Sequence, residues 1–114
     1  MIDGILVYQE MLDVEEAMEE LTDLLDRYDE ALPQAEYDYQ TTKHDVLLDL
    51  RKNHAATVAR EIVRGDPRVA EKRMVRDQLR LRRQTASNEL RKLIGRHLRL
   101  RDEVNRDYGR PSNY

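Results

Sequence analysis

Apolar side chains recur at alternating intervals of four and three residues along the first half of this chain. The row runs from Val7 to Val46 through twelve positions, eleven of them apolar, with Thr42 as the exception. A repeat of 3.5 residues keeps its side chains on one narrow side of a helix, as in coiled coils. The positions between are mostly Glu and Asp. The spacing therefore predicts a long helix with one seam facing another helix. The row is Val7, Met11, Val14, Met18, Leu21, Leu25, Tyr28, Leu32, Ala35, Tyr39, Thr42 and Val46.

Pro33 lies inside this row and lacks the N–H that would bond to the carbonyl of Asp29. Its ring also crowds the preceding turn, so the helix must either kink or break there. The four-three spacing continues unchanged from Tyr28 to Tyr39, whereas a loop would usually shift it. We therefore expect one helix over residues 6–52, kinked at Pro33.

Two further helices are predicted by signals at their ends. Residues 52–54 resemble a helix terminus, and short apolar periodicity over 55–64 ends at Gly65. Asp66 followed by Pro67 is a good N-cap with proline at the first helical position. We expect a short helix over 55–64, a long helix over 67–108 and a flexible tail over 109–114.

Two long helices joined by a short one fold back antiparallel, so we predict an all-α, coiled-coil-like helical hairpin in a single domain, residues 1–108. On the last helix the seam includes His97, expected to meet a facing carboxylate, while Gly95 is expected to allow close packing. The residues predicted to form the hairpin or dimer seam are Leu21, Leu25, Leu32, Leu90, Leu93, His97 and Leu100.

Additional apolar residues fall beside or behind this seam and predict a second contact surface. A homodimer forming a helical bundle is the simplest way to cover it. These residues are Leu12, Leu24, Leu47, Leu48, Leu81, Ile94 and Leu98.

Composition argues against catalysis, cofactors and metals. The chain has no Cys, which excludes disulfides and thiolate chemistry. Its only serines, Ser87 and Ser112, lie in no nucleophile motif, and its three histidines lack metal-binding spacing. We expect no enzyme activity, no bound small molecule and no catalytic, cofactor or metal site. No signal-peptide pattern or run of 18 apolar residues occurs, so we expect no membrane association and a cytoplasmic location.

Charge divides the chain into two parts. Residues 1–66 hold 17 acidic and 6 basic residues, whereas residues 67–114 hold 6 acidic and 14 basic ones. The simplest interpretation is an acidic helix lying along a basic helix in one molecule. Arginines left over on the last helix would suit phosphate or a protein partner, and Arg91, Lys92, Arg96 and Arg99 are the predicted binding face.

The acidic first helix supports a different interpretation. Residues 1–31 contain 11 acidic residues and one base, Arg27. Regularly spaced carboxylates can imitate a phosphate backbone and occupy a nucleic-acid channel. The predicted mimic face is Glu15, Glu16, Glu19 and Glu20.

The central stretch from Lys43 to Arg51, continuing to Ala59 and then from Val63 to Ala70, resembles small helical proteins encoded in the early regions of tailed phages. In those proteins a kinked acidic helix precedes a short helix, a Gly-Asp turn and a long basic helix. The resemblance covers residues 30–105 and implies an accessory role in phage DNA metabolism, in the cytoplasm of the host cell.

Three functions fit these patterns. The leading hypothesis is a non-enzymatic, dimeric interaction protein, encoded by a phage and accessory to DNA recombination or replication. The second is an inhibitor of a host defence protein, of the anti-CRISPR type, acting through the acidic helix. The third is a structural coiled-coil scaffold. A protein partner is expected in each case, and nucleic acid in the first.

Overall fold

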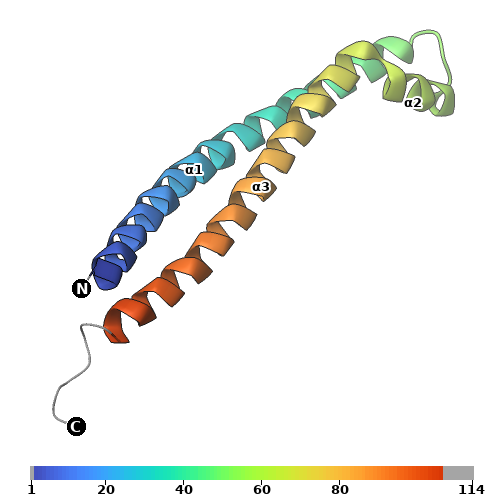
Figure 1. Ribbon diagram of the computed structural model, residues 1–114. Coiled ribbons are helices and arrows are strands. Elements are labelled where there is room, and N and C mark those ends of the chain that lie inside the picture. Colours follow the sequence, from blue (N-terminus) through green and yellow to red (C-terminus); the bar gives the residue numbers. More distant parts are fainter. Residues whose placement is uncertain (1, 107–114) are drawn as a thin grey trace. The chain divides into compact units, whose positions relative to one another are not determined.

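The computed structural model describes residues 2–106, and every regular element in this range is a helix (Figure 1). The helices are α1 (Ile2–Leu50), α2 (Ala56–Gly65) and α3 (Pro67–Val104). Within residues 26–84, ion pairs join Asp29 to Arg83 and Glu36 to Arg76, so residue numbers rise along α1 as they fall along α3. The predicted all-α helical hairpin is confirmed.

The chain divides into two compact units, which we name by their place in the sequence. The terminal unit combines residues 1–25 with 85–114, of which 2–25 and 85–106 are described. The central unit comprises residues 26–84 and contains all of α2. In each unit a segment of α1 lies antiparallel to a segment of α3.

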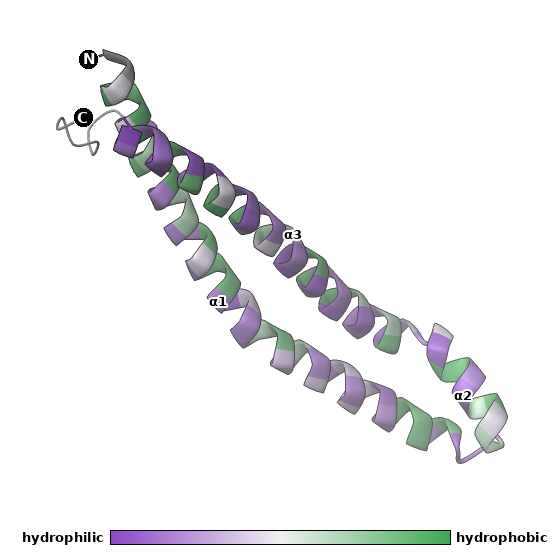
Figure 2. Ribbon diagram, turned by 90° about the horizontal axis from the view of Figure 1, so that it is seen from below, coloured by the Kyte–Doolittle hydropathy of each residue, from purple (hydrophilic) through white to green (hydrophobic). Residues whose placement is uncertain are grey.

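The predicted seam of α1 is the least exposed side of that helix. All twelve positions from Val7 to Val46 are buried or half-buried. Figure 2 shows hydrophobic and hydrophilic residues interspersed along both long helices. This alternation is what a helix with a single apolar stripe requires.

α1 continues unbroken through Pro33, as the unchanged spacing predicted. It begins at Ile2 and ends at Leu50, where residues 51–54 form a turn. In this turn the Arg51 amide donates to the Leu47 carbonyl at 3.0 Å, and its guanidinium donates to the carbonyl of His54 at 3.1 Å. α3 is α-helical to Val104, and residues 105 and 106 continue it as a π-helical turn. The predicted helix end at residue 108 and the predicted tail lie outside the described residues.

The hydrophobic core of the central unit is built by all three helices. Tyr39 and Val46 of α1 meet Val63 of α2 and Val69 of α3. Leu47 packs against this cluster, which corrects its assignment to the second contact surface. The sequence pattern put Leu47 beside or behind the seam, but the cluster against which it packs also includes Val63 of α2.

Asp66 caps α3 as predicted. Its backbone is extended, and its Oδ1 accepts a hydrogen bond from the amide of Arg68 at 2.9 Å. The Arg68 guanidinium also donates to both carboxylate oxygens. Hydrogen bonds from the Arg68 side chain and backbone outweigh partial burial and lower the pKa of Asp66 below its ordinary value.

The expectation that Gly95 allows close packing is wrong. A Cβ at this position would meet only the Arg99 guanidinium, at an ordinary contact distance of 3.7 Å. No backbone approaches it, so the glycine is not needed for packing. None of the helices in residues 2–106 has an apolar stretch long enough to cross a membrane.

Candidate interaction surfaces

Acid–base contacts between α1 and α3 use several of the arginines of the central unit. The Nη1 of Arg76 and the Nη2 of Arg80 each lie 3.3 Å from Glu36 Oε2. The Nε of Arg83 donates to Asp29 Oδ1. Arg83 occupies a seam position where the heptad spacing calls for an apolar residue, and Asp29 supplies its counter-charge. These three arginines therefore serve the hairpin itself.

Two similar contacts join the helices of the terminal unit. Arg96 forms an ion pair with Glu10. The Nε2 of His97 lies 2.9 Å from Glu15 Oε1, the facing carboxylate expected for this seam histidine. Each contact takes one residue away from a predicted binding face. Arg96 was assigned to the basic face and Glu15 to the acidic one, and both are turned toward the neighbouring helix.

The remaining predicted basic residues form an open surface, which we call the basic face: Arg91, Lys92 and Arg99. All three are exposed, and none makes an ion pair with any residue of the 2–106 range. Lys92 and Arg99 are seven positions apart, two helical turns, so they lie on the same side of α3 about 10 Å apart along its axis. Acidic residues are interspersed nearby, with Glu89 exposed one turn before Lys92.

The acidic face is now defined by Glu16, Glu19 and Glu20 of α1. These carboxylates are exposed and have no ion pair within the described part of the chain. Residues 1–25 contain no Lys or Arg, so no base on the same helix segment neutralises them. The terminal unit thus carries an acidic surface on one helix and a basic surface on the other, and neither makes ion pairs within the described residues.

The other predicted seam residues lie where the hairpin requires them. Leu100 is buried, and five leucines are half-buried between the helices of their respective units. Part of each of these five side chains therefore remains accessible to solvent. These five are Leu21, Leu25, Leu32, Leu90 and Leu93.

Most of the predicted second contact surface is exposed. Leu12, Leu48, Leu81, Ile94 and Leu98 all face solvent in this chain. Leu24 is half-buried, and Leu47 belongs to the core of the central unit. The apolar surface that motivated a dimer is therefore present in both units.

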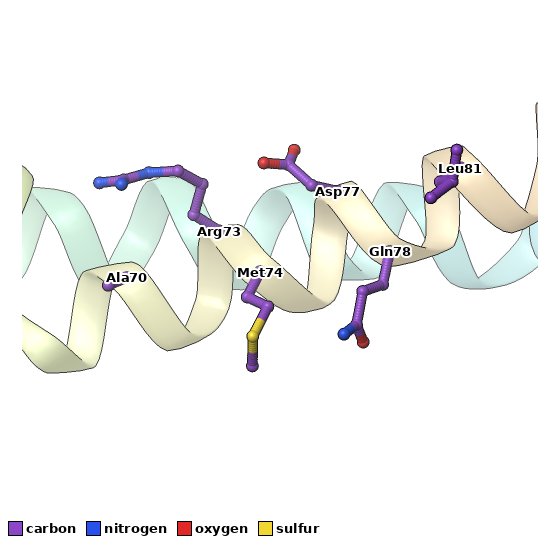
Figure 3. Close-up of a pocket in the computed structure, with 6 residues that line it drawn as sticks. All are labelled: Ala70, Arg73, Met74, Asp77, Gln78 and Leu81. Carbon is purple, nitrogen blue, oxygen red and sulfur yellow. The ribbon is translucent and has the colours of Figure 1, made fainter.

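A strip of mixed character runs along α3 in the central unit (Figure 3). Met74 and Gln78 project to one side of the helix in this view, and Arg73 and Asp77 to the other. A shallow depression of about 390 Å³ lies along the strip, but every residue that lines it comes from α3. One helix cannot surround a ligand, so we regard this strip as exposed surface and not as a binding cavity.

The sequence reasoning missed a group of cations around Tyr39. Its ring centroid lies 4.3 Å from Arg76 Cζ, 5.8 Å from Lys43 Nζ and 6.0 Å from Arg73 Cζ. The spacing of Tyr39 and Lys43, one turn apart on α1, was a visible signal. Its meaning depends on which turn of α3 faces it, and a single sequence does not state this.

Neither a search for a metal site nor comparison with known proteins assigns a function to the chain. Among residues 2–106, no group of three or more His, Cys, Asp and Glu side chains is placed to hold a metal ion. Family models, curated proteins and solved structures all fail to give a significant match to the chain. Function is therefore argued from the surfaces themselves.

Proposed function

We propose that this protein is a non-enzymatic interaction protein, accessory to DNA recombination or replication, whose basic face contacts the phosphate backbone. The observation that carries the proposal is the division among the arginines and lysines of α3. Arg76, Arg80, Arg83 and Arg96 are held by carboxylates of α1, whereas the basic face remains unpaired.

The chemistry of the basic face suits phosphate more than bases. Guanidinium groups match phosphate oxygens in geometry and charge. α3 contains no Phe, Tyr or Trp, the residues that most often stack on exposed bases. Binding would therefore be independent of sequence and weakened by salt. With three contacting cations, the log–log salt slope on duplex DNA should be about −3.

The direct test is fluorescence anisotropy of labelled duplex DNA across a salt titration. The double variant K92E/R99E should weaken binding at least tenfold, since it replaces two attractive charges with repulsive ones. The matched control is K52E/R60E, which changes net charge equally at exposed positions outside the basic face. The control should lose far less affinity than the test variant.

Two results would overturn this proposal. One is equal loss of affinity in both double variants, because that would show a response to net charge and not to a defined face. The other is an absence of DNA binding by the unmodified protein even at low salt. Attention would then move to the acidic face.

The acidic face supports a second candidate function, inhibition of a nucleic-acid-binding defence protein such as a CRISPR effector. The supporting observation is that Glu16, Glu19 and Glu20 are exposed with no base in residues 1–25. Such a surface competes with nucleic acid for a basic channel by charge complementarity.

A competition experiment separates this candidate from the first. In a gel-shift assay, the unmodified protein should displace DNA from a CRISPR effector, and the E16Q/E19Q/E20Q variant should no longer do so. The control E30Q/D45N/E71Q removes three exposed carboxylates outside the acidic face and should still displace DNA. Unchanged displacement by the first variant would rule the candidate out.

A second copy of this chain is the partner we propose for the apolar residues of the terminal unit. Ile5, Tyr8 and Leu12 recur at three- and four-residue spacing on the exposed side of α1, and Ile94 and Leu98 lie one turn apart on α3. The same unit offers complementary acidic and basic surfaces, which favour pairing of the acidic face of one copy with the basic face of the other in a helical bundle.

Sedimentation equilibrium tests this association. The protein should behave as a dimer at micromolar concentration, and L12K/L98K should shift it toward monomer because charges would be buried against apolar surface. The control L48K/L81K carries the same changes in the central unit and should leave the dimer intact. A monomer at all concentrations leaves the scaffold interpretation without its main support.

A further inference from the structure

A small hollow in the central unit is walled by all three helices. Its volume is about 290 Å³, near the lower end for ligand sites. α1 contributes Tyr39 and Lys43, α2 contributes Val63 and Arg64, and α3 contributes Val69 and Arg73. Val63 and Val69 are almost wholly buried, so the apolar side of the hollow is part of the core.

The polar lining carries three cations and no carboxylate. Lys43 and Arg73 make no ion pair with a residue in the described range, and Arg64 has only a 3.9 Å contact between exposed groups with Glu61. Arg73 is positioned by its own hydrogen bond, since its Nη2 donates to the carbonyl of Arg64 at 2.9 Å. The cations are thus gathered without a formal counter-charge in the lining.

Arg76 provides an internal comparison, because it contacts the same aromatic ring. Its Nη1 lies 3.3 Å from Glu36, and its Nη2 lies 3.0 Å from Asp77. The fold therefore neutralises the arginine that lies over the Tyr39 ring and leaves the two neighbouring cations unpaired. Contact with the ring partly offsets their repulsion, since a cation is attracted to an aromatic face.

Tyr39 registers this excess of positive charge. Burial alone would raise the pKa of its hydroxyl, but polar contact with Arg73 and the charges of Lys43, Arg73 and Arg76 outweigh burial. The pKa of Tyr39 is consequently below its ordinary value. The environment thus favours negative charge at this position.

From this geometry we propose that the hollow lined by Lys43, Arg64 and Arg73 is a binding site for a phosphate group. Three cations from three helices can approach different oxygens of one phosphate, and guanidinium groups suit this contact. The site lies in the central unit and uses no residue of the basic face, so it does not depend on the proposed DNA contact. The phosphate can belong to a free nucleotide or to the 5′ end of a nucleic-acid strand.

Calorimetric titration with inorganic phosphate at constant ionic strength tests the site itself. K43Q and R73Q should each weaken phosphate binding about tenfold, because each removes one charge-assisted contact. R60Q is the matched control, since Arg60 is exposed on α2 and does not line the hollow. It should bind phosphate as the unmodified protein does.

A weaker binding of phosphate is meaningful only if the variant protein remains folded. R73Q also removes the hydrogen bond to Arg64, so its helicity is checked by circular dichroism. The Lys43 side chain makes no hydrogen bond to another described residue, so K43Q is the safer variant. If phosphate fails to bind at millimolar concentration, or if K43Q and R60Q bind it equally, the proposal is wrong.

Two further titrations identify the source of the phosphate. A nucleoside monophosphate is compared with a single-stranded oligonucleotide carrying either a 5′-phosphate or a 5′-hydroxyl group. A preference for the phosphorylated oligonucleotide that K43Q abolishes assigns the site to strand ends. Stronger binding of the nucleotide assigns it to a free ligand. K92E/R99E should leave phosphate binding intact, so failure of the DNA proposal and failure of this one are distinguishable.

Discussion

The central and terminal units use the same two long helices and differ in what covers them. In the central unit α2 adds a third wall, and Val63 and Val69 are 2% and 0% exposed. Among the described residues of the terminal unit, the buried hydrophobic ones are Val14 of α1 and Ala86 and Leu100 of α3. The core of the central unit is therefore closed by α2, whereas the seam of the terminal unit has no third helix to cover it in the described part of the chain.

This difference assigns separate roles to the two units. Two helices bury only one stripe each, and Ile5 and Leu6 of the terminal unit remain more than 60% exposed. Its basic and acidic faces also make no ion pairs within the described residues. We infer that the central unit supplies most of the stability, whereas the terminal unit supplies the contacts with the DNA backbone and with a second copy of the chain.

The largest expected effect comes from matched valine substitutions. V63A leaves a cavity inside a closed core and should lower the free energy of unfolding by about 2 kcal/mol. V14A in the terminal unit should cost about 1 kcal/mol, because the open seam can relax and admit water. Urea denaturation followed by circular dichroism measures both. Equal losses would show that the two units are equally well packed.

P33A should stabilise the central unit. A proline inside a helix costs about 3 kcal/mol relative to alanine, and the packing that has adapted to Pro33 should reduce the gain to about 1–2 kcal/mol. The same denaturation experiment reads the gain, with Q34A at the exposed neighbouring position as control. A loss of stability would mean that the local geometry imposed by Pro33 is needed for packing between α1 and α3.

G95A changes the terminal unit and should narrow the difference in stability between the two units. A Cβ here meets only the mobile end of Arg99, so alanine should gain close to its helix propensity, about 1 kcal/mol. Native-state hydrogen exchange of amides near residue 95 should slow accordingly. Faster exchange would indicate that the helices approach more closely at Gly95 than the structure shows.

The smallest expected effect is a pH dependence that comes from the central unit. The pKa of Asp66 is lowered in the folded state, so its charged form adds stability above the ordinary aspartate pKa. That contribution disappears as the pH falls through the folded-state pKa. D66A should lower the melting temperature at neutral pH. D66N keeps a capping oxygen and should lose less, while removing this part of the acid dependence. An unchanged acid profile in D66N would show that the cap charge does not contribute.

Sequence reasoning succeeded where the relevant information is local or periodic. The four-three spacing predicted the buried side of α1 and its passage through Pro33, and the Asp66–Pro67 pair predicted the start of α3. The place of His97 on the seam also predicted that its ring would face a carboxylate, although not which one. These features depend on a residue and its near neighbours along one helix.

The rest required knowing which turns face each other across the hairpin. Only the structure shows that Arg96 is paired with Glu10 while Lys92 remains unpaired. The same holds for the cations around Tyr39, which come from helices separated by α2. The position of Leu47 in the core likewise depends on where α2 packs. Pairings across helices are set by register, which the periodicity of one helix does not specify.

Amide hydrogen exchange with and without duplex DNA tests the division of roles most directly. We predict that duplex DNA with 5′-hydroxyl ends slows exchange in residues 88–104 of the terminal unit and leaves the core around Val63 and Val69 unchanged. K92E/R99E should abolish this protection, and K52E/R60E should retain it. Protection confined to the central unit, or no protection at a DNA concentration that saturates anisotropy, would contradict the assignment of partner binding to the terminal unit.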